Sequence, residues 1–202
     1  RIAVAHANTT LKNHYRSDNS SFHVIDYDTL TGAVRNRHTH QGHADGSAWA
    51  RGQAWGLYGY ALMYRETRDP QYLLQAQKIA DFMLKHPNMP TDLVPYWDFD
   101  VPDTANAPRD ASAASIMASA LLELADYVPA DQVDTYRKPA VVALHSLGSP
   151  AYTAALGEFD PFLLKHATGH KPHNSEIDVP IIYGDYYYLE ALLRYRSELA
   201  GK

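Results

Sequence analysis

One stretch of the sequence, ASAASIMASALLELADYV at residues 111–128, restricts the fold more than any other. Its side chains are mostly small or aliphatic, and this composition favours a helix against which other helices can pack closely. Asp110 stands directly before it, at the position where a side-chain oxygen accepts hydrogen bonds from the first free N–H groups of a helix. The stretch therefore predicts a closely packed helix that begins after Asp110.

Other helices are expected on both sides of this one. They are predicted from Ile2 onward, from 46 or 47 to near 69, over 70–86, over 129–147 with a bend or restart at Pro139, and over 181–199. Long polar loops separate them, notably 87–110 and 169–180, and one short extended piece covers 22–27. The pattern predicts an all-α fold of stacked helical hairpins, as in a helical toroid. No repeat of fixed period is detectable, which disfavours a solenoid.

Composition narrows the classes of protein that the chain can represent. The 202 residues suffice for one domain, which we expect to extend over 1–202. The net charge of -5 comes without charged runs, so no nucleic-acid partner is expected, and no apolar run predicts a membrane span. The absence of cysteine fits a reducing compartment and favours the cytoplasm, with the periplasm left open. The 15 tyrosines and 11 histidines suit a pocket for a polar ring.

Residues 38–55, HTHQGHADGSAWARGQAW, gather the chemically interesting side chains. His38, His40 and His43, with Asp45, could in principle converge on a metal ion. The usual helix-borne spacing of two zinc histidines is missing, so no metal is expected here.

The second half of the same stretch indicates a carbohydrate instead. Gln53 follows Trp49 by four residues and Trp55 follows Arg51 by four, so one pair can face a pocket while the other packs behind it. An indole stacks on a sugar face and a guanidinium forks onto a carboxylate, which suits an acidic sugar. The alternative is an amphipathic helix with tryptophans in the core. None of the aspartates has a context that marks it as a catalytic acid.

Four segments extend this interpretation. HQGHADGSAWARGQAWGLYGY, PYWDF, RDASAAS and EIDVPIIYGDYYYLEALLR resemble, in this order, glycoside hydrolase family 88, the unsaturated glucuronyl hydrolases. The resemblance extends from AHANTT to the last helix, and WARGQAW is a specific signature. It implies an (α/α)6 toroid that needs no cofactor. It also implies substrates with a 4,5-unsaturated uronic acid at the non-reducing end, in which an aspartate protonates C4 and assists water addition at C5.

The resemblance also implies roles for individual residues. His23 of FHVIDYD is similar to the family histidine near the reacting ring. His40 and Gln41 of HQG resemble pocket residues that contact the unsaturated uronate. Arg51 resembles its partner on the carboxylate side, and Trp55 resembles the stacking residue.

Trp49 and Gln53 belong to the same motif and are assigned to the pocket without a specific role. The family's acid/base aspartate lies upstream of the segment that matches AHANTT, and this chain has no aspartate before Asp18. We therefore expect the chain to be the C-terminal half of such a domain, inactive alone, with the catalytic aspartate before Arg1 and the N-terminal half as its partner. Alternatives are an unsaturated rhamnogalacturonyl hydrolase and a non-catalytic carbohydrate-binding helical protein.

Overall fold

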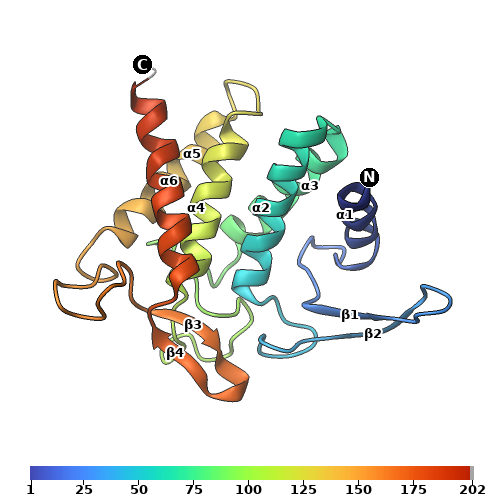
Figure 1. Cartoon of the computed structure of the whole chain (residues 1–202), viewed down its shortest axis with the longest axis horizontal. Helices are drawn as coiled ribbons and strands as arrows, with labels where there is room; N and C mark the ends of the chain where they lie inside the picture. The colour runs from blue at the N-terminus through green and yellow to red at the C-terminus, as the bar shows by residue number, and fades with distance from the viewer. Residues whose placement is uncertain (201–202) are drawn as a thin grey trace.

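The computed structural model describes residues 1–200, and helices dominate it (Figure 1). The α-helices are α1 (Ile2–Asn13), α2 (Ala50–Thr67), α3 (Pro70–Lys85), α4 (Ala111–Ala125), α5 (Val133–Leu147) and α6 (Ile182–Ala200). Two antiparallel hairpins pair β1 (Val24–Tyr27) with β2 (Val34–His38), and β3 (Ala167–His170) with β4 (Ser175–Val179). A short 3-10 helix, η1 (Lys171–His173), connects β3 to β4.

The predicted small-residue helix, α4, is the centre of the molecule. Every one of its residues is buried, and it packs against α2, α5 and α6. The Asp110 side chain accepts hydrogen bonds from the backbone N–H groups of Ser112 and Ala113, which confirms the predicted cap. Alanine and serine side chains leave room for neighbouring helices on all sides, so α4 can be surrounded.

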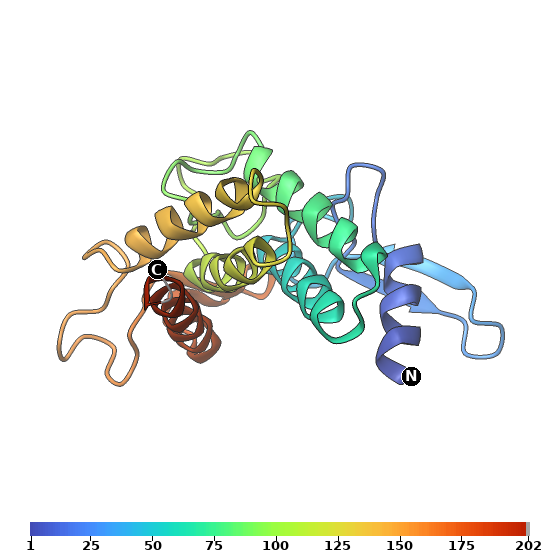
Figure 2. The same ribbon diagram turned by 90° about the horizontal axis from the view of Figure 1, so that it is seen from above.

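The helices form two layers (Figure 2). In one layer α2, α4 and α6 lie side by side, and in the other α3 packs on α2 while α5 packs on α4. One face of α3 is turned inward, with Tyr72, Ala76, Ile79 and Met83 buried, while Leu74 is 52% exposed. This alternation agrees with the expected (α/α)6 toroid, of which six helices are half.

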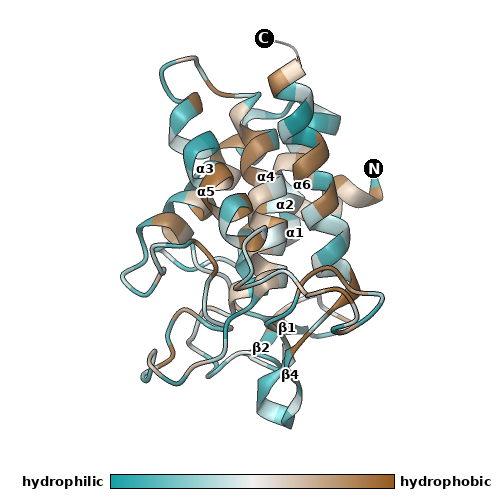
Figure 3. Ribbon diagram, turned by 90° about the vertical axis from the view of Figure 1, so that its left-hand side faces the viewer, coloured by the Kyte–Doolittle hydropathy of each residue, from teal (hydrophilic) through white to brown (hydrophobic). Residues whose placement is uncertain are grey.

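The outer face of α6 carries exposed apolar side chains. Ile182, Tyr186, Leu189 and Leu193 follow one another at helical spacing and remain between 47% and 66% exposed. We call these four residues the α6 stripe; hydrophobic stretches on the helices are visible in Figure 3. A continuous apolar stripe of this kind is typical of a helix face that packs against another layer. None of the helices in residues 1–200 combines the length and apolar character needed to cross a membrane.

Both hairpins lie at the end of the molecule where α2, α4 and α6 begin (Figure 1). The sequence predicted only the extended piece that contains β1. It placed the start of α2 too early, because Trp49 forms a bridge with Asp98 and the Ala50 N–H donates to the Trp97 carbonyl. The helix predicted over 129–147 begins only at Val133, and it does not restart at Pro139, since α5 is continuous through this residue.

Candidate functional site

A cavity of about 500 Å³ opens between α1, α2 and the segment that leads into β1. Trp49, Trp55 and His23 contribute to its lining, together with Tyr15 and Tyr60. None of the residues that line this cavity in the described chain is an aspartate or glutamate. The described lining of the cavity is therefore aromatic and rich in histidine, and it contains no carboxylate side chain.

The two tryptophans of the WARGQAW motif take different positions. Trp49 is 8% exposed and lies 4.4 Å from the His23 ring, centroid to centroid. A side chain at Gly52 would meet the Trp49 indole, since an added Cβ would lie 2.8 Å from its Cε3 atom. Trp55 is more accessible and its ring meets Tyr187 edge to face at 5.1 Å. Of the two, Trp55 is the less buried.

His23 is held by the loop that follows β2. The backbone N–H groups of His40 and Gln41 each donate to its Nδ1 atom at 3.1 Å. Because Nδ1 accepts these bonds, the neutral ring carries its hydrogen on Nε2. Burial lowers the pKa of His23 to about 4, and His40 and Arg51 act in the same direction. The ring is therefore a neutral donor at neutral pH.

The lowered pKa of His23 predicts a pH dependence of stability. The unfolded chain takes up this proton near pH 6.5 and the folded chain only near pH 4, so stability is lost as pH falls through this window. Because the ring is partly exposed and solvent screens it, we expect the free energy of unfolding to fall by about 1–2 kcal/mol over this pH range. Urea unfolding of the wild type and of His23→Gln at pH 7 and pH 4 measures it. Equal losses in the two proteins would contradict the assignment.

Arg51 lies in a buried hydrogen-bond network of the protein itself. Its side chain is 2% exposed, and Nη1 donates to the Asp110 carboxylate at 2.8 Å and to the Thr168 carbonyl at 2.6 Å. Nη2 donates to the Gly169 carbonyl at 2.8 Å. The guanidinium thus binds a carboxylate of the protein itself and ties the start of α2 to α4 and β3. This network positions the start of α2 relative to α4 and β3, and the contact of Arg51 with a uronate carboxylate stays a prediction.

Gln53 and Gln41 each join two segments of the chain by hydrogen bonds. Gln53 is 1% exposed, and its side-chain amide donates to Ser21 Oγ and accepts from the Ser21 backbone N–H. This contact fixes the segment before β1 on α2 and leaves Gln53 away from the surface. Gln41 donates from Nε2 to the Gly169 carbonyl at 2.8 Å, and so joins the loop after β2 to β3.

Sequence reasoning missed the part played by Asp98. This residue is 0% exposed, and its Oδ2 atom accepts from the His43 N–H at 2.9 Å and from Ser47 Oγ at 2.7 Å. Burial raises its pKa. Gly42 allows this approach, because an added Cβ would lie 3.0 Å from the carboxylate. Through Asp98, the long polar loop 87–110 supports the loop that contains His40 and Gln41.

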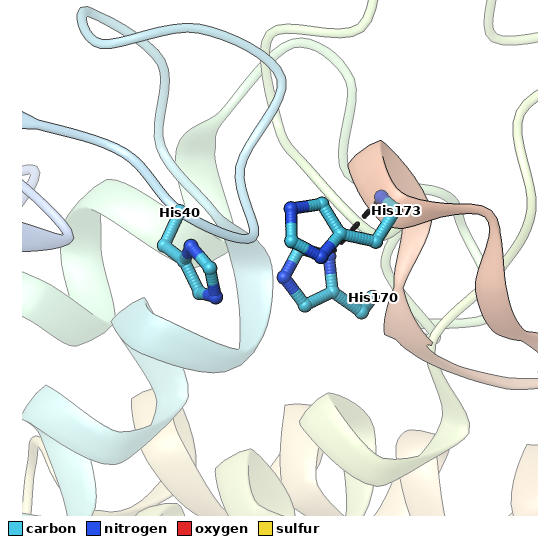
Figure 4. A group of neighbouring side chains, drawn as sticks. All are labelled: His40, His170 and His173. Atoms are coloured by element: carbon cyan, nitrogen blue, oxygen red, sulfur yellow. Dashed lines mark hydrogen bonds between the residues drawn. The ribbon is translucent and has the colours of Figure 1, made fainter.

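The H-x-H-x-x-H pattern does not converge on one point. His38 pairs with Asp26, at 3.2 Å between Nε2 and Oδ2, while the exposed His43 ring lies 6.3 Å from Trp97. His40 instead meets His170 and His173, which the sequence had not singled out. Within residues 1–200 these three form the one group with metal-ligand spacing (Figure 4).

The site can be compared with known proteins. The paired helical layers of this chain are those of part of an α/α toroid. No family model matches the chain. An unsaturated glucuronyl hydrolase of Formosa agariphila is 53% identical over 96% of this chain and 48% of its own length. One of a Bacillus species is 38% identical over 100% of this chain and 53% of its own length.

Solved structures agree with these relatives. The crystal structure of an unsaturated glucuronyl hydrolase specific for heparin superimposes with a TM-score of 0.95 at 52% identity, and covers 98% of this chain and 53% of the solved one. The chain is a homologue of the unsaturated glucuronyl hydrolases and spans about half the length of the curated relatives it matches. This agrees with the expected C-terminal half of the family domain.

Proposed function

We propose that the protein to which this chain belongs is an unsaturated glucuronyl hydrolase. The observation that carries the proposal is the 53% identity with such a hydrolase along 96% of this chain, supported by the TM-score of 0.95. Its substrates are oligosaccharides with a 4,5-unsaturated uronic acid at the non-reducing end. The reaction adds water across the enol-ether double bond, after which the hemiketal collapses and the next sugar leaves.

Within this function the described residues form one wall of the substrate pocket. Trp55 stacks on the sugar, and His23 donates from Nε2 toward the reacting ring. His40 and Gln41 contact the uronate from the loop after β2, while Trp49, Arg51 and Gln53 hold this wall in place. The helices α2, α4 and α6 begin at this end, and the partial positive charge of helix N-termini favours a uronate carboxylate.

The proton for C4 comes from outside this wall. No aspartate or glutamate lines the cavity in the described chain, and the buried Asp98 and Asp110 already accept hydrogen bonds from their neighbours. The acid/base aspartate is therefore assigned to the other half of the domain, together with activation of the water that attacks C5. His23 is a neutral hydrogen-bond donor in this scheme and not the source of the proton.

The test is the ultraviolet absorbance of the conjugated double bond. The complete protein should remove this absorbance from a heparin-derived unsaturated disaccharide, and Trp55→Ala should lower kcat/KM by about 10- to 100-fold, as expected from the loss of about 1–3 kcal/mol of stacking. Phe159→Ala, which changes an aromatic side chain that is 45% exposed in a loop, is the control and should retain the rate. Unchanged absorbance with unsaturated disaccharides would contradict the proposed function.

A further inference from the structure

Three histidines meet at the hairpin end of the molecule from segments far apart in sequence. His40 lies in the loop after β2, His170 ends β3, and His173 ends η1. The His40 ring lies 4.5 Å from that of His170 and 5.1 Å from that of His173, between centroids, while the His170 and His173 rings stack at 4.0 Å. Each offers one nitrogen, and these nitrogens all lie within 4.8 Å of one another (Figure 4).

The two segments are fastened to each other beside the histidines. Gln41, next to His40, donates to the carbonyl of Gly169, next to His170. Arg51 donates to the same carbonyl and is itself held by Asp110. A buried hydrogen-bond network therefore holds the segments of His40 and His170 near each other, in addition to the contacts between the rings.

The imidazole groups of this cluster lack protein partners for most of their nitrogens. His170 accepts the His173 backbone N–H at Nδ1 over 3.3 Å, and its Nε2 atom is buried without a hydrogen-bond partner. No hydrogen bond joins the three rings to one another, and none of them forms an ion pair with a carboxylate within residues 1–200. Buried polar nitrogens are normally satisfied, so the unpartnered Nε2 atom of His170 points to a bound group that supplies its partner.

We propose that His40, His170 and His173 bind one divalent transition-metal ion of the zinc type. Each histidine supplies one ring nitrogen and water completes a tetrahedral shell. Zinc–nitrogen distances are about 2.0–2.1 Å, so closing the site requires the accessible His173 ring to turn out of its stack on His170 and the accessible His40 ring to turn toward them. A site made of imidazoles without carboxylates selects Zn²⁺, Ni²⁺ or Cu²⁺ over Mg²⁺ and Ca²⁺, which prefer oxygen ligands. His40 is shared with the proposed uronate pocket, so the metal and the substrate compete.

Titration calorimetry with ZnCl2 tests the proposal on protein first treated with a chelator. The wild type should bind one Zn²⁺ per chain at this site, and Mg²⁺ should give no binding heat. His173→Gln should weaken zinc binding by at least about tenfold, because it removes a direct ligand. His173 is exposed, so the variant should retain the wild-type circular dichroism spectrum.

The control is His145→Gln, which changes an exposed histidine on α5, outside the cluster. It should bind zinc with the wild-type affinity. Absence of zinc binding by the wild type would overturn the proposal, as would a His173→Gln variant that binds like the wild type, or an equal loss in His145→Gln. The readout is metal binding without turnover, so its failure is distinct from a failure of the proposed function.

Discussion

Asp110→Asn should lower the free energy of unfolding by about 3–5 kcal/mol, the cost of leaving one charge of a buried ion pair without its partner. The Asp110 carboxylate is 0% exposed and Arg51 is 2% exposed, so water cannot reach the guanidinium to solvate the charge that loses its partner. Asparagine keeps the size of the side chain and also caps helices well, so the start of α4 should be retained. Urea unfolding followed by circular dichroism measures the effect.

Asp69→Asn is a matched control for this experiment. Asp69 caps α3 in the same manner, accepting from the Gln71 backbone N–H, but it lies in a more accessible position and forms no ion pair in the described chain. Its replacement should change the free energy of unfolding by less than about 0.5 kcal/mol. Equal losses in the two variants would mean that the cap and not the Arg51 charge pair governs the effect.

The sequence was sufficient for the parts of the fold that depend on local chemistry. The cap at Asp110 and the small residues after it are patterns within one helix, and the structure confirms them. The start of α2 was misplaced because Trp49 pairs with Asp98, a contact across the fold that no local pattern shows. The β3–β4 hairpin was missed because its sequence contains Pro172 and reads as a polar loop.

In the candidate site too, local patterns could be recognised from the sequence, whereas contacts between distant segments could not. The sequence indicated which residues matter between 38 and 55, but their roles depend on partners far along the chain. Arg51 meets Asp110, 59 residues away, and Gln41 meets Gly169, 128 residues away. The ion pair of Arg51 with Asp110 is a contact between distant segments that the sequence around Arg51 does not show. A signal for the histidine cluster existed in HKPH, at residues 170–173, but its partner His40 becomes evident only from the fold.

Residues 1–202 prepared alone should give no detectable turnover of an unsaturated disaccharide. The proposed pocket wall supplies hydrogen bonds and stacking, but its cavity has no carboxylate to protonate C4. Adding the other half of the domain as a separate chain should restore the loss of ultraviolet absorbance, because the α6 stripe offers an apolar surface for its packing. Turnover by residues 1–202 alone would place the acid within this chain.

Leu193→Glu examines the packing step separately. The substitution puts a charge into the α6 stripe, where burial by the second half would be costly, so restored activity should fall by at least about tenfold at equal concentrations. Leu74→Glu on α3 is the matched control, since both leucines are 52% exposed before substitution. Without the second half, light scattering should detect self-association of the wild type. Leu193→Glu should reduce this self-association, and Leu74→Glu should leave it unchanged. A monodisperse wild-type monomer would show that the α6 stripe tolerates water and is no interface.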